Sequence, residues 1–234
     1  MNEQTLSKRL ELVASFVPDG ARIADIGTDH AYLPVNLALK GKIKFAIASD
    51  VVQGPYQSAA NQIALSKVGD KVEARLASGL ASIKEEDKID TVTICGMGGA
   101  LIAEILEEGY AKKHLSGDEL LILQPNVSAQ SIRLWFNNHG YTLLAEEILE
   151  ENEKIYEILV AKKQETSHKL NKDELMFGPI LMQNPSPAFR KKWSQEFEKN
   201  EYIIHQLKNV TLDQSEKIAE FQEMNKKIRE LLEQ

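Results

Sequence analysis

The sequence predicts an α/β fold built on a doubly wound, mostly parallel sheet. Apolar runs typical of buried strands alternate with helical patterns over residues 23–138, an order that produces parallel strands joined by right-handed crossovers. The first strand ends in D-I-G-T-D-H, which crowds carboxylates and a glycine just before a helix. The second strand ends at Asp50, whose carboxylate can accept hydrogen bonds from both hydroxyls of a ribose. Together these features predict a site for a nucleoside-containing cofactor at the carboxyl edge of the sheet.

The elements follow from apolar periodicity, and turn residues mark the ends of several of them. A first helix over 6–16 has apolar residues at helical spacing and ends at Pro18-Asp19-Gly20. The predicted strands are 23–26, 45–50, 72–76, 90–95, 119–124, 141–149 and 155–162, and the helices between them are 31–40, 54–67, 100–108 and 128–138. Because no helix separates the last two strands, we expect them to form an antiparallel hairpin. A seven-strand sheet with such a hairpin is the architecture of class I methyltransferases.

The chain changes character after Lys163, which predicts a cofactor-binding domain at 1–163 and a helical arm at 164–234. Residues 164–173 are polar and are typical of a linker. Two helical patterns follow, separated by Thr211-Leu212-Asp213. Their apolar stripes are Trp193, Phe197, Ile204 and Leu207, and then Ile218, Phe221, Met224, Ile228 and Leu231. The stripes predict an antiparallel helical hairpin resembling a short coiled coil, which would serve as an arm for a large substrate or as a homodimer contact.

Composition disfavours several classes of protein. Hydrophobic residues make up 43% of the 234 residues, but no apolar run approaches the roughly 20 residues that span a bilayer. The single Cys95 gives neither a disulfide framework nor a zinc site, and the five histidines are scattered. Since the N-terminus lacks a signal-peptide pattern, we expect a cytoplasmic protein that binds no membrane and no metal. The net charge of −7 argues against nucleic acid, although the acidic excess lies before Lys163.

The loop after the first strand narrows the choice of cofactor. A dinucleotide-binding loop needs G-x-G-x-x-G so that its backbone can approach a pyrophosphate. Here Gly27 is followed by Thr28 and Asp29, and a carboxylate would repel phosphate. Acidic groups instead favour the sulfonium and ammonium of S-adenosylmethionine, so NAD is the weaker alternative. We therefore assign Asp25, Gly27 and His30 to cofactor binding; the alternative is that Asp25 and Asp29 only cap the next helix.

Three further strand ends complete the predicted cofactor site. We expect the end of the second strand to face the ribose and the end of the third strand to border the adenine, to which a backbone N–H of Gly79 or Leu80 can donate. After the fourth strand, the glycines of C-G-M-G-G allow close backbone approach, with a tight strand-to-helix turn as the alternative. The residues assigned here are Asp50 and Val51, then Ser78, Gly79 and Leu80, then Gly96 and Met97.

Gln124-Pro125-Asn126 closes the fifth strand, next to where a methyl acceptor should lie. Methyltransferases that modify exocyclic amines carry an Asn/Asp-Pro-Pro-aromatic motif there, whereas here two amides flank one proline and no aromatic residue follows. Gln124 and Asn126 are candidates for hydrogen bonds to the edge of a base. The alternative is a proline-terminated strand followed by an asparagine turn.

Four segments carry a resemblance to a known family: L-S-K-R-L near the N-terminus, A-D-I-G-T-D-H-A-Y-L-P, C-G-M-G-G and Q-P-N. The chain resembles the bacterial tRNA (adenine(22)-N1)-methyltransferases, which act on the D-arm of tRNA, over the catalytic domain and in outline over the arm. The resemblance implies a class I fold, S-adenosylmethionine as cofactor and methylation of adenine N1. Since the transfer places positive charge on the adenine, Asp29 is the candidate that stabilises this charge, and Tyr32 is the candidate that contacts the base. N1 is masked in a paired stem, so the nucleotide must be flipped out at a cost of a few kcal/mol.

Two other functions stay open at this point. One is a methyltransferase for a small molecule or for another base position such as N6, and the other is a non-catalytic RNA-binding protein with a relict cofactor fold. For the tRNA function, the basic run Arg190-Lys191-Lys192 beside Trp193 is expected to contact the phosphate backbone, with Arg133 and Lys112-Lys113 contributing.

Overall fold

The computed structural model describes residues 5–165, 168–209 and 213–233. Its strands form one seven-stranded sheet in the order β3-β2-β1-β4-β5-β7-β6. Strand β7 is antiparallel to both of its neighbours, and the other neighbouring pairs are parallel. The predicted doubly wound sheet with a C-terminal antiparallel hairpin is confirmed. The strands are β1 (Ala21–Ile26), β2 (Ile43–Asp50), β3 (Val72–Leu76), β4 (Thr91–Gly98), β5 (Leu120–Val127), β6 (Tyr141–Glu151) and β7 (Lys154–Lys163).

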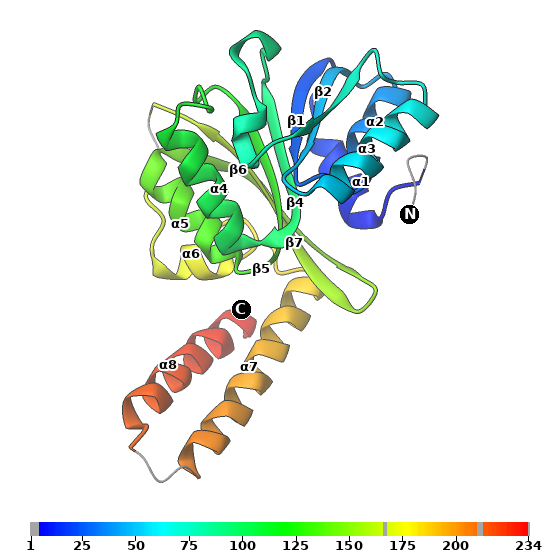
Figure 1. Ribbon diagram of the computed structural model, residues 1–234. Helices are drawn as coiled ribbons and strands as arrows, with labels where there is room; N and C mark the ends of the chain where they lie inside the picture. Colours follow the sequence, from blue (N-terminus) through cyan, green and yellow to red (C-terminus); the bar gives the residue numbers. More distant parts are fainter. Residues whose placement is uncertain (1–4, 166–167, 210–212, 234) are drawn as a thin grey trace.

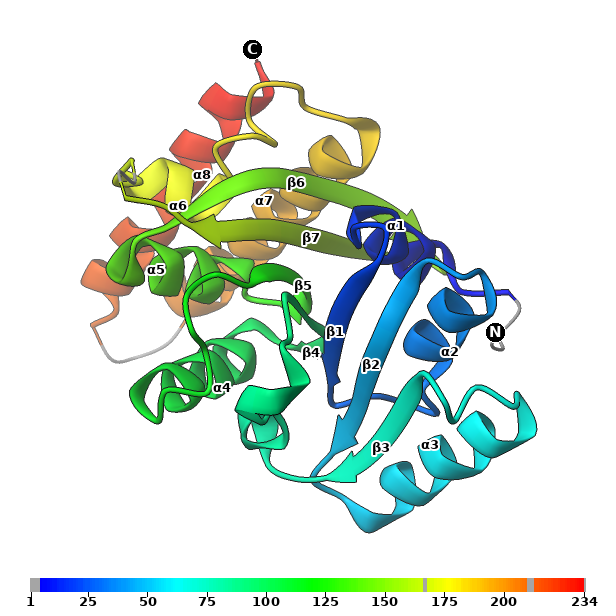
Figure 2. The same ribbon diagram turned by 90° about the horizontal axis from the view of Figure 1, so that it is seen from above.

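Helices cover both faces of the sheet, as Figures 1 and 2 show. One face carries α1 (Lys8–Phe16), α2 (Tyr32–Leu39) and α3 (Gln53–Leu65), and the other carries α4 (Gly99–Ala111) and α5 (Ala129–His139). Each layer has its own apolar core, since the first cluster includes residues of α1 to α3 and the second includes residues of α4 and α5. Burial of apolar helix stripes against both faces fixes the strand ends in place along one edge.

Strands β4 and β5 run further than the sequence predicted. Their pairing continues, with irregular register, through Met97 opposite Pro125 and Gly98 opposite Val127, whereas glycine and proline usually end a strand. The glycine run is therefore part of β4 and not a loop beyond it. Gly99, the first residue of α4, lies so close to Ser128 that a Cβ would come within 2.1 Å of the Ser128 carbonyl oxygen. Close packing, and not ligand approach, explains that glycine.

The C-terminal part forms the predicted helical hairpin. Helices α7 (Pro187–Lys208) and α8 (Ser215–Leu232) lie side by side and project away from the sheet (Figure 1). Between them, the buried Asn200 amide donates to the Asn225 side-chain oxygen at 2.9 Å, a polar contact that favours one register of the two helices. Of the predicted turn between them, Thr211 and Leu212 lie outside the described residues. Among the described helices, none is long and apolar enough to cross a membrane.

The linker prediction was wrong at its end. Asn171 accepts hydrogen bonds from the N–H groups of Asp173 and Glu174, and Glu174 reciprocates, which starts the short helix α6 (Lys172–Phe177). This is a capping box, and its signal was readable as Asn171 followed three residues later by Glu174. Residues 166–167 of the linker lie outside the described part of the chain. The division of the chain at residue 163 stays a prediction.

Arg133 requires a correction, because its side chain is fully buried on α5 and cannot contact RNA. Its guanidinium donates to Glu146 of β6 at 2.6 Å and to Glu157 of β7 at 2.5 Å. Burial alone would raise the pKa of Glu157, but the charges of Arg133 and Lys192 hold it below its ordinary value. The Arg133 cluster, defined as Arg133, Glu146, Glu157 and Lys192, therefore joins α5 to the β6–β7 hairpin and to the arm.

Two cations of the run Arg190-Lys191-Lys192 join the arm to the sheet, and the third joins the two helices of the arm to each other. Arg190 donates to the carbonyl of Leu232 at the end of α8, and Lys191 pairs with Glu150 of β6 at 2.6 Å. Lys192 pairs with the buried Glu157. These cations are already paired within the protein, which weakens the prediction that they are the main contacts to RNA.

Candidate functional site

A cavity of about 300 Å³ opens at the carboxyl ends of β1 and β4. We call it the β1–β4 cavity. Of the residues assigned from the sequence, it brings together Asp25, Gly27, Asp29, Gly96 and Met97. The other lining residues are Arg9, Leu10, Thr28, Leu33 and Cys95. The cavity thus lies where ligands bind in open α/β sheets.

Asp25 is the buried carboxyl group of this cavity. Its side chain accepts a hydrogen bond from the Thr93 hydroxyl at 2.7 Å, which fixes the carboxyl group at the end of β1. Burial raises the pKa of Asp25 to about 6, although the Thr28 and Thr93 hydroxyls act in the opposite direction. Because burial disfavours the ionised form of Asp25, a cation that binds beside its carboxylate stabilises that form.

The loop between β1 and α2 has an unusual backbone. Gly27 has φ +70°, and His30 and Ala31 have positive φ values of 55° and 53°. Non-glycine residues in this region cost roughly 1–2 kcal/mol each, and such strain gathers at functional sites. Ala31 occupies the N-cap of α2 without a side-chain cap hydrogen bond. The N-cap position belongs to neither aspartate, Asp25 accepts from Thr93 on β4, and the exposed Asp29 carboxylate lies beside His30. These contacts do not support the alternative that Asp25 and Asp29 serve only to cap α2.

Asp29 and its neighbours lie at the exposed side of the cavity. The Asp29 side chain is 79% exposed, with a carboxylate oxygen 3.4 Å from Nε2 of His30. The His30 ring stacks on Tyr32 with ring centroids 5.3 Å apart. The three side chains predicted for the acceptor and the cofactor thus form one cluster that a large substrate can reach.

Met97 lies directly over Gly27. A Cβ added at Gly27 would come within 1.8 Å of the Met97 methyl carbon, so the absence of a side chain at Gly27 makes room for Met97. Both residues line the β1–β4 cavity. A thioether in this position can adapt its shape to a ligand because methionine has three rotatable bonds.

The side-chain amides of Gln124 and Asn126, at the end of β5, were predicted to bind the edge of a base, but both form hydrogen bonds within the protein. Gln124 is fully buried, and its oxygen accepts hydrogen bonds from Arg9 at 2.5 Å and from the Gly96 N–H at 3.2 Å. Its NH₂ group donates to the Pro125 carbonyl at 2.9 Å. Gln124 therefore holds the cavity wall together, and we withdraw its predicted contact to a base. Asn126 donates to the Gly96 carbonyl at 2.7 Å, but its side chain is exposed and remains available to an acceptor.

The remaining assigned residues lie along the same sheet edge but outside the lining of the cavity. Asp50 accepts from the Val52 N–H at 2.7 Å, and the neighbouring Val51 is exposed. Ser78 precedes the short 3₁₀ helix η1 (Gly79–Ser82), in which Gly79 has φ +51° and Leu80 is buried.

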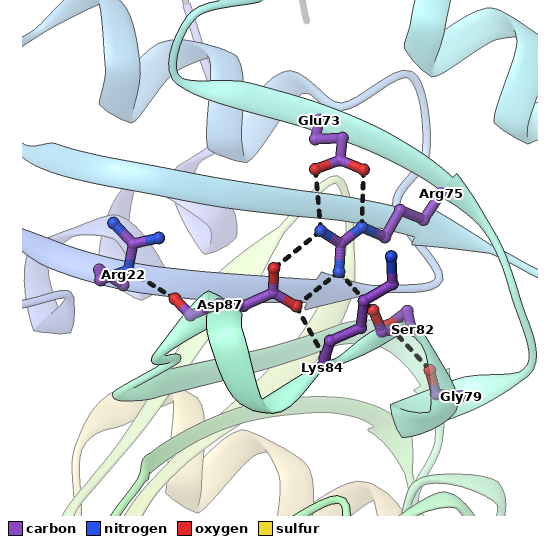
Figure 3. Close-up of polar contacts among 7 residues, drawn as sticks. All are labelled: Arg22, Glu73, Arg75, Gly79, Ser82, Lys84 and Asp87. Atoms are coloured by element: carbon purple, nitrogen blue, oxygen red, sulfur yellow. Dashed lines mark hydrogen bonds and ion pairs between the residues drawn. The ribbon is translucent and has the colours of Figure 1, made fainter.

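Figure 3 shows what holds the segment 78–82 in place: the Arg75 guanidinium donates to both Glu73 and Asp87 and to the Ser82 carbonyl. The pKa of Asp87 lies below its ordinary value because of the hydrogen bonds from Arg75. Arg75 thereby ties η1 to β3 and to the segment around Asp87.

Arg9 is the site residue that the sequence reasoning missed. Arg9 comes from α1, outside the β–α units that carry the other site residues. Its guanidinium carbon lies 5.5 Å from the centroid of the Tyr156 ring. The only signal was its place in the L-S-K-R-L segment, where Lys8-Arg9 reads as a solvated helix face. Among the described residues, no group of three His, Cys, Asp or Glu side chains could hold a metal ion.

Replacing Asp25 with asparagine is expected to stabilise the fold at neutral pH and to weaken cofactor binding. The pKa of about 6 lies above the ordinary 3.8, so the ionised group costs stability above pH 6. This cost reaches about 3 kcal/mol at pH 7 and disappears as the pH falls below 4. Urea unfolding at pH 7.5 and pH 5 measures this cost. The free energy of unfolding of the wild type should rise between pH 7.5 and pH 5 as Asp25 takes up a proton, and the Asn variant should lack this rise. Asp29→Asn is the exposed control and should leave the unfolding free energy unchanged at both pH values. An Asp25→Asn protein that is less stable than wild type at pH 7.5 would contradict the conclusion that burial destabilises the ionised Asp25.

Sequence comparisons place the chain among known proteins. Residues 23–234 match the family described as tRNA (adenine(22)-N(1))-methyltransferase. The chain is similar to the tRNA (adenine(22)-N(1))-methyltransferase of Bacillus subtilis, with 41% identity over 239 aligned positions that cover 100% of this chain and 99% of that protein.

Solved structures agree with these matches. A Streptococcus pneumoniae protein in complex with S-adenosyl-L-methionine is similar with a TM-score of 0.88 and 45% identity, covering 97% of this chain and 100% of that one. TrmK of M. capricolum in complex with S-adenosyl-homocysteine is similar with a TM-score of 0.85 and 31% identity, covering 97% of this chain and 98% of that one.

Proposed function

The chain belongs to the tRNA (adenine(22)-N(1))-methyltransferase family, and we propose that the β1–β4 cavity is where it transfers a methyl group from S-adenosylmethionine to N1 of adenine 22 in tRNA. The single observation that carries this assignment is the cavity itself. It joins carboxylates and two glycines with positive φ at the ends of β1 and β4. We also expect the enzyme to act in the cytoplasm.

The residues present fit S-adenosylmethionine, which supplies an electrophilic methyl group on a sulfonium. Gly27 and Gly96 leave backbone open to a ligand, and the buried Asp25 carboxylate suits its ammonium group. On this proposal Asp50 accepts from the ribose hydroxyls, and the segment Ser78–Leu80 borders the adenine ring. Met97 packs against the sulfur-bearing part from above Gly27.

The acceptor chemistry asks little of the protein beyond positioning and charge. N1 of adenine bears a free lone pair and needs no general base to attack a methyl group. Positive charge then appears on the adenine, and a nearby carboxylate stabilises the transition state more than the ground state. Asp29 is exposed at the cavity, next to the stacked His30 and Tyr32 rings, which supports its role at the acceptor. Tyr32 and Asn126 are the proposed contacts to the base.

Radiolabelled methyl transfer tests the proposal. The full chain should label a tRNA that carries adenine at position 22 and should leave the same tRNA with guanine at that position unlabelled. Free adenosine and other small acceptors should receive no label. Label on small molecules, or on both tRNAs equally, would overturn the proposed acceptor.

For the path of the RNA, a groove runs from Asn126 to the arm. Two adjoining hollows of about 330 and 560 Å³ share Asn126, Val127, Ile155, Lys192, Glu196 and Lys199 among their lining residues. Lys154, at the tip of the β6–β7 hairpin, and Lys199 on α7 are exposed there. We infer that the RNA strand leaving the cavity follows this groove and that the arm contacts the tRNA mainly through Lys199. Lys199 has an exposed ion pair with Glu196 at 3.2 Å, which RNA can displace, whereas Lys192 of the same groove is held by the buried Glu157.

Replacing both Lys154 and Lys199 with glutamine is expected to weaken tRNA binding. The slope of the logarithm of the binding constant against the logarithm of the salt concentration should fall in magnitude by roughly one per lysine. Binding is measured by titration at several salt concentrations, and S-adenosylhomocysteine affinity should not change. Lys112 and Lys113, predicted from the sequence to contribute to the phosphate contacts, lie at the end of α4 and hence at the opposite edge of the sheet from this groove. Replacing both with glutamine is the matched control, and the groove predicts a smaller loss there. Equal losses in the two double variants would contradict the groove as the path.

A further inference from the structure

The β1–β4 cavity has one cationic side chain among its described lining residues, Arg9. Of its two lining acids, the buried Asp25 suits the ammonium group of the cofactor, and Asp29 lies at the exposed side proposed for the acceptor. The methionine part of S-adenosylmethionine also carries a carboxylate, which neither acid can bind. The cavity therefore needs a positive partner for that carboxylate if it is to hold the whole zwitterion.

We propose that Arg9 binds the carboxylate of the methionine group of S-adenosylmethionine. This inference rests on the proposed function, since it assumes that the β1–β4 cavity is the cofactor site. The Arg9 guanidinium donates one hydrogen bond to the buried oxygen of Gln124 at 2.5 Å. Among the residues that the structure describes, no other acceptor takes a hydrogen bond from this guanidinium, so most of its five N–H donors are left for a ligand. A guanidinium can bind a carboxylate through two parallel hydrogen bonds.

The surroundings of Arg9 hold it in place before a ligand binds. Gln124 anchors Nη1, and Tyr156 lies under the guanidinium with its ring centroid 5.5 Å away. A Cβ at Gly96 would come within 3.7 Å of the same Nη1. Because Gly96 has no side chain and φ +80°, space beside the guanidinium stays open toward the cavity.

The same contacts join the two halves of the site. Gln124 accepts from Arg9 and from the Gly96 N–H, and Asn126 donates to the Gly96 carbonyl. A carboxylate bound by Arg9 would therefore be connected through Gln124 and Gly96 to Asn126, at the start of the RNA groove. Arg9 is in this sense a cofactor-binding residue contributed by the N-terminal helix.

Calorimetry with two ligands tests the proposal directly. The first ligand is S-adenosylhomocysteine, and the second is its analogue that lacks only the carboxylate and keeps the amine. Wild type should bind the first about tenfold more tightly or better, given what charge-assisted hydrogen bonds contribute. Arg9→Met should lose this preference: its affinity for S-adenosylhomocysteine falls by about tenfold or more, whereas its affinity for the analogue stays within about twofold of wild type.

Two further variants separate binding from structure. Lys8→Met removes the same charge from the adjacent, exposed position of α1 and should leave both affinities unchanged. Arg9→Lys should retain part of the preference for the carboxylate, which keeps the test decisive if Arg9→Met folds poorly.

Equal losses for both ligands in Arg9→Met would overturn the proposal, because Arg9 would then act only by holding Gln124. Unchanged affinity for both ligands would also overturn it, and a loss of tRNA binding in the same variant would assign Arg9 to a phosphate. Failure of the cofactor site itself has a different signature, since wild type would then bind neither ligand.

Discussion

Replacing Asp29 with asparagine is expected to lower the rate of methyl transfer by roughly 100-fold or more, the range seen when a group that stabilises developing charge is removed. The Asp29 carboxylate is exposed at the β1–β4 cavity beside His30 and Tyr32. Its negative charge matters most in the transition state, in which the adenine begins to carry the positive charge. The affinity for S-adenosylhomocysteine should change little, because that ligand carries no sulfonium and Asp25 remains for its ammonium.

Single-turnover labelling of tRNA gives the rate, and calorimetry gives the affinity. Asp70→Asn is the matched control, since Asp70 is an exposed aspartate in the turn before β3, at the opposite edge of the sheet. If rate and affinity fall together in Asp29→Asn, Asp29 is a ligand of the cofactor, and the acceptor role passes to Asn126 or Tyr32.

Replacing Arg133 with methionine is expected to lower the free energy of unfolding by about 3–5 kcal/mol, because the buried Glu146 would be left without a cation and the buried Glu157 with Lys192 alone. Glu146 and Glu157 both contact the Arg133 guanidinium, and all three side chains are buried. Burial tends to lower the pKa of Arg133, but the charges of Glu157 and Glu146 outweigh it and raise the pKa. Urea unfolding monitored by far-UV circular dichroism measures the loss.

Neutralising the acids tests the physical reason. Adding Glu146→Gln and Glu157→Gln to Arg133→Met should recover part of the lost stability, since no ionised group then remains buried in the Arg133 cluster. Lys112→Met breaks an exposed ion pair with Glu108 and should leave stability unchanged. A small loss in Arg133→Met alone would show that water reaches the two carboxylates.

The sequence by itself determined the order of the strands and of the helices between them, the antiparallel hairpin and the edge of the sheet that carries the site, although α6 was missed. These features follow from local signals, because periodicity reports which face of a segment is buried. The loop Gly27–His30 was readable for the same reason: its glycine and carboxylates act within a few residues of one another. β3 was predicted to the residue, since Val72–Leu76 is an apolar-periodic segment between clear turns.

Only the tertiary structure decided which side chains meet. Arg9 reaches Gln124 across 115 positions of the chain, and no periodic pattern encodes such a pair. The sequence predicted that Arg133 is an exposed cation on a helix, but β6, β7 and α6 bury it. The sequence predicted that the Gln124 amide is available to a base, but its oxygen accepts hydrogen bonds from Arg9 and from the Gly96 N–H. In each case the packing of separate elements fixed the partner, and a polar group inside a fold must find a partner wherever the packing supplies one.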